Sequence, residues 1–361
     1  MRANRFPSRP AWSHILPNLP VPQRLALVVL AIVTLSGSWS AAARKESGPP
    51  RYTVTELPIP PGAVGAYAFD INQRGEIVGM ANFPNGIGGY GVRWSSRGVE
   101  VLDMVPGSDR CWAWSISENG TVSGGCSVPA SPATAFPVVW PRTTPVLLDS
   151  VGRFAIGAAL NNRGDVVGYA DDGPLTVPVI WRKGAAFTMQ SLGGREAAAV
   201  SVNASGQSVG WASVTDGLVK AVTWDRDGML ETLDEVWSQA YAINRSGDVV
   251  GSRIVGGIPV ARFWAHSGVG GQDLTPLYSE AYDINDAGWS VGFVNEPPEA
   301  TAFVHDGTSL HELRNLVEGP NPFDNFTEAR AIGNRGEIVG VGRRGDQTSV
   351  PFLLTPTSRV H

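Results

Sequence analysis

Two serines of the 361-residue chain lie in the pattern Gly-x-Ser-x-Gly, which positions the nucleophile in many serine hydrolases. The pattern surrounds Ser208 and Ser290. In those enzymes it forms a sharp turn between a strand and a helix, and the turn exposes the serine hydroxyl. Here the same position of sister segments holds Ile77, Val166 and Val249, which favour strands. We therefore expect both serines to lie within strands, and we predict no catalytic residue at either motif.

Other segments with suggestive residues also lack the context that their chemistry requires. Residues 86–91 match Gly-x-Gly-x-x-Gly but lead into a strand, whereas a dinucleotide site needs a following helix. Residues 225–228 (Asp-Arg-Asp-Gly) resemble part of a calcium loop, but the full ligand pattern is missing and a solvated turn is expected. His266, His305 and His311 show no metal-ligand spacing. We expect no cofactor and no metal.

A nine-residue segment that recurs along the chain organises everything else. Its first copy is residues 71–79 (Ile-Asn-Gln-Arg-Gly-Glu-Ile-Val-Gly), and every copy has glycines at its fifth and ninth positions. Asn at the second position can hydrogen-bond the backbone two residues on, and the first glycine closes a tight turn. The flanking β-branched residues favour strands. The segment therefore predicts a hairpin, with first glycines at positions 75, 120, 164, 206, 247, 288 and 336.

The spacing of these hairpins predicts an all-β fold, a β-propeller. The glycines follow one another by 41 to 48 residues, and each repeat offers four short strands, a to d, without helical periodicity. The seventh repeat stops after strand c, and residues 52–57 match a strand d. We predict a seven-bladed β-propeller of four-stranded blades, whose ring is closed when strand 52–57 completes the last blade.

Two recurring columns support this arrangement. Strand c ends in tryptophan in five repeats, at Trp94, Trp140, Trp181, Trp224 and Trp264, which indicates packing between blades rather than a sugar-binding set. Strand a carries a column of small residues, as expected where blades crowd near the axis. The column of mostly larger residues beside it should face the other way: Phe69, Trp114, Ala158, Val200, Tyr241, Tyr282 and Arg330.

Charge and the N-terminal segment indicate export. The formal net charge is −5, and removing residues 1–43 leaves 24 basic and 33 acidic residues, or −9, which argues against nucleic-acid binding. The apolar run 25–35 follows Arg24 and precedes Ala41-x-Ala43, which is typical of a secretory signal peptide. An uncleaved N-terminal anchor is the alternative. We predict a signal peptide (1–43), a linker (44–51), a propeller (52–357) and a tail (358–361), giving an exported, periplasmic or extracellular monomer without a membrane span.

The two cysteines predict one disulfide. Cys111 and Cys126 bracket the second hairpin, and the chain is expected to reach an oxidising compartment. If Ser117–Gly120 forms a four-residue loop, Ile116 faces Thr121 and Cys111 then faces Cys126, within bridging range.

These repeats resemble the HAF-repeat family of putative extracellular proteins. The resemblance rests on the pattern Ala-x-x-Ile-Asn-x-x-Gly-x-Val-Val-Gly, the strand ending in Trp, the strand ending in Leu, and the link Leu192-Gly193-Gly194. It covers residues 52–354, although the name-giving His-Ala-Phe occurs in no copy in full. The resemblance implies export and repeats rather than an established activity.

We predict that the chain is a non-catalytic binding scaffold for an extracytoplasmic partner, a carbohydrate or a protein, because no catalytic constellation recurs. The alternative is a propeller enzyme, a lyase or hydrolase, with its site at the channel mouth. The a–b turns are uniform, whereas the b–c and d–a connections at the opposite end vary, as functional loops often do. The candidate contact residues at that end are Tyr67, Arg110, Trp112, Arg195, Glu196, Trp237, Tyr278, Glu280, Phe323, Asp324 and Glu328.

Overall fold

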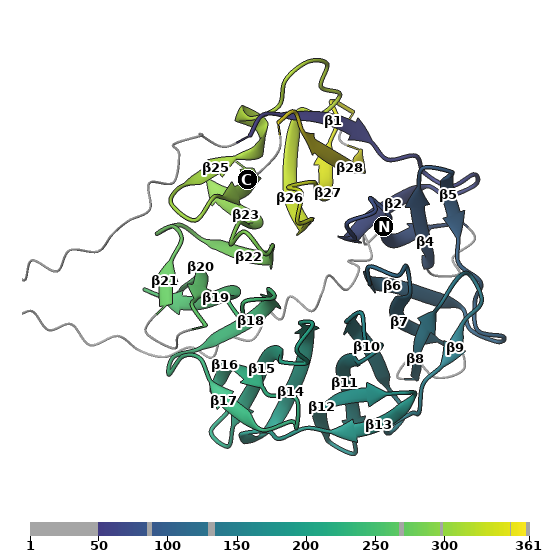
Figure 1. The fold of residues 1–361 in the computed structure, drawn as a ribbon, viewed down its shortest axis with the longest axis vertical. Coiled ribbons are helices and arrows are strands. Elements are labelled where there is room, and N and C mark those ends of the chain that lie inside the picture. The colour runs from purple at the N-terminus through teal and green to yellow at the C-terminus, as the bar shows by residue number, and fades with distance from the viewer. Residues whose placement is uncertain are drawn as a thin grey trace, which may run out of the picture. The chain divides into compact units, whose positions relative to one another are not determined.

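The computed structural model describes residues 50–84, 89–128, 134–266, 271–296, 299–346 and 348–358. Residues 47–361 form one compact unit. The predicted signal peptide, linker residues 44–49 and tail residues 359–361 lie outside the described residues, as do residues 86–88 of the glycine-rich motif. Within the described ranges the chain forms strands and one 3-10 helix, η1 (Leu313–Asn315), and the sheets are arranged around a common axis (Figure 1).

Five sheets have four strands each, and their strands follow the expected order a, b, c, d from the axis outward. The first holds β2 (Gly65–Ile71), β3 (Ile77–Asn82), β4 (Gly89–Ser95) and β5 (Gly98–Val101). The second holds β6 (Arg110–Ile116), β7 (Val122–Ser127), β8 (Ala135–Trp140) and β9 (Val146–Leu147). Two further sheets hold β18 (Ser238–Ile243), β19 (Val249–Val255), β20 (Ile258–Trp264) and β21 (Gly271–Asp273), and β22 (Ser279–Ile284), β23 (Ser290–Glu296), β24 (Glu299–His305) and β25 (Leu310–Glu312).

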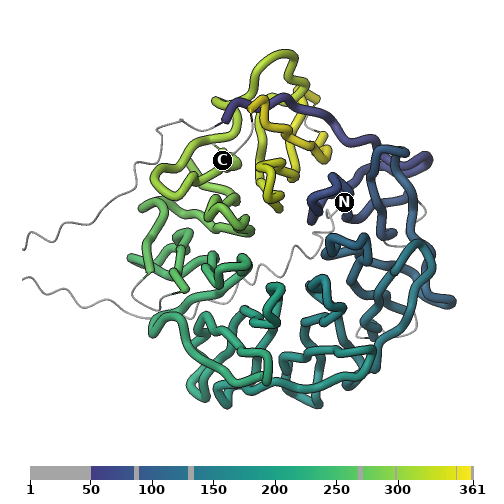
Figure 2. Tube along the Cα trace, viewed as in Figure 1, coloured from purple at the N-terminus to yellow at the C-terminus, as the bar shows by residue number. Residues whose placement is uncertain are grey.

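The fifth four-stranded sheet joins the two ends of the described chain. Its order is β1 (Tyr52–Glu56), β28 (Ser349–Pro356), β27 (Ile338–Arg343) and β26 (Asn325–Ile332). The predicted pairing of the first strand with the last is observed, from Tyr52 opposite Pro356 to Glu56 opposite Phe352. Figure 2 shows the purple start of this strand running beside the yellow end of the chain. The pairing covers an edge of β28 that would otherwise be open.

The prediction of seven four-stranded blades is wrong, because the structure has five blades of four strands. The third and fourth repeats instead form one eight-stranded sheet, with β10 (Ala155–Leu160), β11 (Val166–Asp172), β12 (Leu175–Arg182), β13 (Ala185–Thr188), β14 (Gly193–Val202), β15 (Ser208–Val214), β16 (Val219–Trp224) and β17 (Leu230–Thr232). The physical reason is the length of β14, which starts early enough to form a parallel bridge between Glu196 and Thr176 of β12. The all-β propeller class itself agrees with the sequence.

Neighbouring sheets pack face to face around the ring. Strand β2 contacts β26, β27 and β28, so the first sheet packs against the last. One apolar cluster joins Ala66 and Val92 of the first sheet to Ala331 and Val339 of the last. All five predicted tryptophans are buried between sheets, and four donate their indole N–H to a backbone carbonyl of the preceding repeat, for example Trp140 to Asp103 at 2.9 Å. The tryptophan column is therefore core, as predicted.

The inner strand of every repeat contains a β-bulge that the sequence did not reveal. In β2 the register with β3 shifts between Ala68 and Asp70, so Phe69 is the additional residue. A bulge bends its strand and changes the direction of the side chain it carries. The same shift occurs in all seven repeats, and we call these residues the bulge column: Phe69, Trp114, Ala158, Val200, Tyr241, Tyr282 and Arg330.

The second glycine of each repeat explains how the bulge is encoded. A Cβ on Gly79 would lie 1.8 Å from the carbonyl oxygen of Tyr67, so only glycine allows the bulged strand to approach so closely. The equivalent glycines would place a Cβ between 1.7 and 2.1 Å from the corresponding carbonyl oxygens: Gly124, Gly168, Gly210, Gly251, Gly292 and Gly340. The repeated glycine therefore serves the bulge as well as the hairpin.

The disulfide is confirmed, although two details of the predicted register differ. Cys111 and Cys126 are bonded and lie directly opposite each other, with their Cα atoms 4.1 Å apart. The loop has five residues, because Ile116 pairs with Val122 rather than with Thr121. The bulge at Trp114 restores the register by one residue, so the two errors cancel.

Candidate functional site

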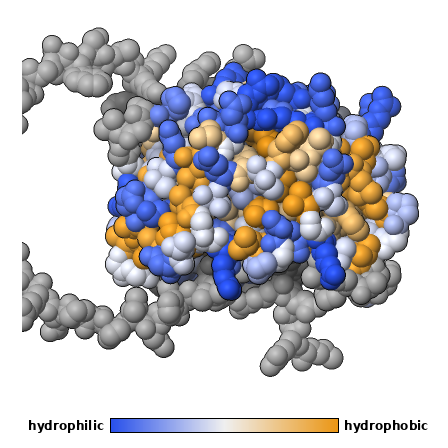
Figure 3. All heavy atoms as spheres, turned by 90° about the horizontal axis from the view of Figure 1, so that it is seen from below, coloured by the Kyte–Doolittle hydropathy of each residue, from blue (hydrophilic) through white to orange (hydrophobic). Residues whose placement is uncertain are grey.

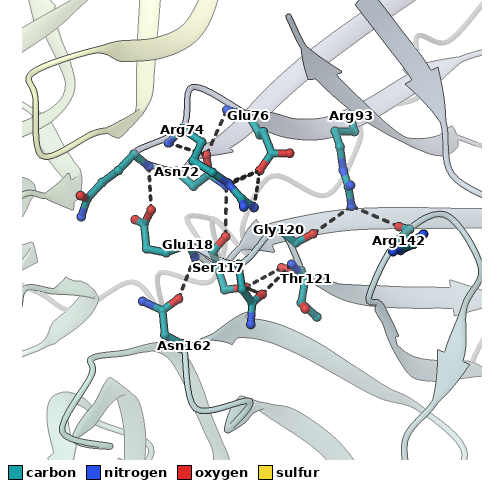
Figure 4. Close-up of polar contacts among 12 residues, drawn as sticks. Asn72, Arg74, Glu76, Arg93, Ser117, Glu118, Gly120, Thr121, Arg142 and Asn162 are labelled. Carbon is teal, nitrogen blue, oxygen red and sulfur yellow. Dashed lines mark hydrogen bonds and ion pairs between the residues drawn. The ribbon is translucent and has the colours of Figure 1, made fainter. Parts of the chain in front are cut away.

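The a–b turns form one continuous hydrogen-bonded structure, which we call the turn belt. Asn72 accepts hydrogen bonds from the backbone N–H groups of Arg74 and Glu76 through its Oδ1 atom, both at 3.0 Å. Its Nδ2 atom donates to the carbonyl oxygen of Ser117 in the next sheet at 3.1 Å (Figure 4). Asn72 thus closes its own turn and also joins the neighbouring turn. The first role was predicted from the sequence, and the second was not.

The belt continues through most of the ring. The Nδ2 atoms of Asn161, Asn203, Asn244 and Asn285 each donate to the carbonyl at the same position of the following repeat, at 3.1 to 3.3 Å. Ser117 instead bonds within its own turn, to Asn119 and Thr121. There Glu118 joins the turns, since its carboxylate accepts from the Gln73 N–H and its own N–H donates to Asn162. The Asn side-chain amides at this end of the ring are therefore engaged in hydrogen bonds that stabilise the fold.

A polar cluster lies on the inner strands of three consecutive sheets, and we call it the inner arc: Tyr241, Glu280, Tyr282, Glu328 and Arg330. The Arg330 Nη2 atom lies 2.7 Å from Glu328 Oε2, and its guanidinium carbon lies 4.7 Å from the centre of the Tyr282 ring. The rings of Tyr241 and Tyr282 are 5.9 Å apart. Three of the five residues belong to the bulge column, so the bulges bring them toward their neighbours.

Burial sets the electrostatics of the inner arc. Glu280 is 5% exposed, and burial raises the pKa of its carboxyl to about 7, although a hydrogen bond to Tyr282 and the charge of Arg330 favour ionisation. Burial also raises the pKa of Tyr241 and of Tyr282 well above the ordinary value for tyrosine, with the charge of Glu280 adding to the effect. Burial acts to lower the pKa of Arg330, but Glu328 and Tyr282 outweigh it and the pKa is raised. A titratable carboxyl near neutral pH is thus held beside a permanent cation.

The bulge-column side chains of the other four inner strands are apolar: Phe69, Trp114, Ala158 and Val200. Phe69 and Trp114 stack with ring centres 4.7 Å apart, and they pack with Met80, Trp112 and Ile156. Val200 and Trp211 pack next to Tyr241 and Tyr282, which places them between this apolar cluster and the inner arc. The bulge column is therefore asymmetric, because its polar side chains all lie on β18, β22 and β26.

The b–c and d–a connections, together with the strand ends beside them, carry most of the exposed apolar side chains. Among the described residues, three of the eleven exposed large hydrophobic residues lie in d–a connections and three at strand ends beside b–c turns: Val64, Val236 and Leu277, and Leu175, Val255 and Ile258. The a–b turns contribute none of the eleven. The others lie on outer strands or in a c–d turn, and Figure 3 shows apolar patches on the outer wall viewed from below. The end opposite the turn belt therefore has the composition of a contact surface.

The structure places four of the eleven predicted contact residues in or beside the inner arc. Tyr67, Tyr278, Glu280 and Glu328 belong to or adjoin the inner arc, since the charges of Glu280 and Glu328 raise the pKa values of Tyr278 and Tyr67 after burial. Trp237 is half-buried and lies in the connection immediately before β18. The remaining six lie on other strands and connections: Arg110, Trp112, Arg195, Glu196, Phe323 and Asp324.

Several of these six have structural roles. Phe323 is 5% exposed and packs on Phe326 and Phe352 in the last sheet. Trp112 is 6% exposed and belongs to the apolar cluster, beneath the guanidinium of Arg110 at 6.0 Å. Glu196 forms the bridge that joins the eight-stranded sheet. Substituting Phe323 or Trp112 would consequently test the core rather than a surface.

Sequence reasoning missed Tyr241, Tyr282 and Arg330. All three were placed in the correct column of strand a but were interpreted only as its larger face. The signal that could have found them is chemical variation within a repeated column, because the column is apolar in the first four repeats and polar in the last three.

The motifs interpreted as structural from the sequence have structural roles. Ser208 and Ser290 lie on β15 and β23 and are almost fully buried. Asp225 accepts hydrogen bonds from the N–H groups of Asp227 and Met229, which closes a c–d turn. Across the described ranges, no group of three or more His, Cys, Asp or Glu side chains is arranged to hold a metal ion. Nor does that part of the chain contain a helix long and apolar enough to cross a membrane.

Comparisons with known proteins identify the fold. No family model matches the chain, and no curated protein matches it either. A puromycin-hydrolyzing peptidase from Mycobacterium tuberculosis has a TM-score of 0.57 at 11% identity, over 86% of this chain and 56% of that one. The β-propeller domain of the Trilobed protease from Pyrococcus furiosus has a TM-score of 0.55 at 10% identity, over 81% and 98%. A puromycin hydrolase has a TM-score of 0.56 at 13% identity, over 82% and 53%.

The chain is a β-propeller. It spans about half the length of the two puromycin hydrolases, and nearly all of the Pyrococcus propeller domain. At these identities the similarity shows the fold alone, and any function has to come from the site itself.

Proposed function

We propose that this propeller is an exported, non-catalytic binding scaffold for a carbohydrate or protein partner. The observation that carries the proposal is the difference between the two ends of the ring. One end is a belt of amide hydrogen bonds, while the other exposes Val236, Val255 and Leu277 around half-buried Trp237 and Tyr278. Rigid scaffolds commonly bind through variable connections of this kind. The disulfide Cys111–Cys126 supports export, because such bonds persist in oxidising compartments.

Binding at this end can be tested with paired variants. We expect Trp237→Ala and Leu277→Ser to weaken partner binding in a surface-plasmon assay with envelope glycans and envelope proteins as analytes. The matched control is Arg245→Ala in the turn belt, whose guanidinium is largely exposed and forms a surface ion pair with Asp286. If Arg245→Ala weakens partner binding and the other two variants do not, the partner binds at the turn belt and the proposal is wrong.

A second candidate function is a hydrolase or lyase, and one observation favours it. Glu280 titrates near neutral pH beside two tyrosyl hydroxyls and Arg330, which is the environment of a general acid or base. An enzyme of this kind would release products from a bound glycan, and Glu280→Gln would abolish turnover. The binding scaffold predicts bound but intact glycan after prolonged incubation, as measured by mass spectrometry.

A further inference from the structure

The inner arc is graded in burial from its edge to its interior. At its edge Glu328 and the adjoining Tyr67 and Tyr278 are half-buried. In its interior Glu280, Tyr282 and Arg330 are each less than 9% exposed. The half-buried side chains come from β2, from the connection before β22 and from β26. The buried ones lie next to them on the same strands or sheets. Solvent therefore reaches a rim of three polar side chains supported by a buried polar interior.

The charges of this arc are balanced. The Arg330 guanidinium pairs with the Glu328 carboxylate, and burial raises the pKa of Glu280 to about 7, so its carboxyl carries only part of a negative charge at neutral pH. A charged ligand would find no unpaired opposite charge here, and burying a net charge is costly. The arc is consequently suited to an uncharged polar ligand.

The hydrogen-bonding groups of the arc are mixed donors and acceptors. Tyrosyl hydroxyls and a protonated carboxyl can do both, a carboxylate accepts and a guanidinium donates. The Arg330 Nε atom is buried without a hydrogen-bond partner among the described residues. Aromatic rings adjoin these groups, since Tyr278 packs on Phe293 at 5.6 Å and Phe293 packs on Tyr282 at 5.8 Å. A ligand whose hydroxyl groups lie beside apolar C–H faces would match both the hydrogen-bonding groups and the aromatic rings.

We propose that the inner arc binds an uncharged saccharide, with Tyr67, Tyr278 and Glu328 contacting its hydroxyl groups. Glu280, Tyr282 and Arg330 act as positioning residues that hold the contacting side chains. This inference rests on the proposed binding function and specifies its ligand class. A protein partner would instead use the exposed apolar connections and would not require the arc.

The test is a glycan array with the full chain, followed by calorimetric titration of the best neutral oligosaccharide. We expect binding of neutral gluco-, galacto- or manno-oligosaccharides and weaker binding of their uronic-acid or sulfated counterparts. Tyr278→Ala and Glu328→Gln should each raise Kd about ten- to hundredfold, because each removes a hydrogen bond in a partly buried site. The control Val146→Ser on the outer wall, 50% exposed, should leave Kd unchanged.

A purely structural role for Glu280 would change stability but not the pH profile of binding. We expect the Kd of the native protein to change between pH 6 and pH 8, and the Kd of Glu280→Gln to stay constant over that range. Tighter binding of acidic than of neutral saccharides would overturn the proposal. So would a neutral saccharide whose Kd is the same for the native protein, Tyr278→Ala and Glu328→Gln.

The outcome also separates this inference from the proposed function. If no saccharide binds but a photo-reactive residue at Val236 cross-links a protein partner, the saccharide assignment fails and the scaffold function stands. If neither glycan nor protein binds, both fail.

Discussion

The turn belt and the bulge column are neighbours on the same inner strands, because each bulge residue lies three positions before the second residue of its nine-residue segment, yet the two regions use repetition in different ways. The belt repeats one residue type, so that Asn161, Asn203 and Asn244 make the same two kinds of bond. The bulge column repeats one backbone shape and varies its side chains from Phe69 to Arg330. The recurring Asn of the belt is explained by its role in the fold. The side chains of the bulge column differ on one backbone shape, so they can serve in recognition of a ligand.

The largest expected effect concerns the glycine opposite the bulge. Gly79→Ala would bring its Cβ to 1.8 Å from the Tyr67 carbonyl oxygen, and a backbone clash cannot be relieved by a rotamer change. We expect a loss of about 3 kcal/mol or more in the free energy of unfolding, measured by urea denaturation. Gly65→Ala is the control in the same hairpin, because no atom lies within 4 Å of its added Cβ. Equal stability of the two variants would contradict the account of the bulge.

The second effect is a pH dependence that belongs to the inner arc alone. The pKa of Glu280 rises from 4.5 to about 7 on folding, so the folded state binds more protons than the unfolded state in that window. The contribution of Glu280 to the free energy of unfolding is therefore largest below pH 4.5. It decreases as the pH rises toward 7, and the total decrease is roughly 3 kcal/mol at most.

Glu280→Gln removes this titration. The difference in unfolding free energy between variant and native protein should grow in favour of the variant from pH 4.5 to pH 8, as followed by denaturation at several pH values. If this difference in unfolding free energy does not change with pH, the pKa of Glu280 is not raised on folding. The inner arc and the turn belt would then not differ in their electrostatics.

The third effect concerns the belt. Asn72→Ala removes the bond to the Ser117 carbonyl and leaves the N–H groups of Arg74 and Glu76 without their side-chain acceptor. We expect a cost of about 2 kcal/mol in thermal or urea unfolding, with unchanged ligand affinity. Gln73→Ala is the control, since Gln73 joins the belt through its backbone N–H. A large change in affinity with Asn72→Ala would mean that the belt itself takes part in binding.

The smallest effect on stability concerns the exposed connections. Val236→Ser and Leu277→Ser change side chains that are 43% and 40% exposed, so unfolding free energies should change by about 0.5 kcal/mol or less. A marked fall in melting temperature would show that these residues support the fold rather than a partner.

The sequence predicted those features that depend on repeated local chemistry. The hairpins, the tryptophan core and the partner of the first strand all follow from spacing and residue type. The number of separate blades did not, because the eight-stranded sheet depends on a single parallel bridge between Thr176 and Glu196. No local pattern distinguishes such a bridge from two sheets that merely pack together.

The candidate site was predicted only in part for a related reason. Glu280 and Glu328 were selected as residues of the connections, although they lie within β22 and β26, as do their partners Tyr282 and Arg330. Side-chain direction in a strand alternates, and a bulge changes that alternation. The second glycine of each repeat indicates the bulge. Its role follows only from the structure, which places the carbonyl oxygen of the bulged strand where a Cβ would otherwise lie.

The belt holds the ring together, while the opposite end and the inner arc bind the partner. Hydrogen exchange measured by mass spectrometry, with and without a saturating neutral oligosaccharide, tests this division most directly. The account predicts slower exchange in the first residues of β2, β22 and β26 and no change in turns 161–165, 203–207 and 244–248. Protection confined to those turns, with none in the three strands, would contradict it.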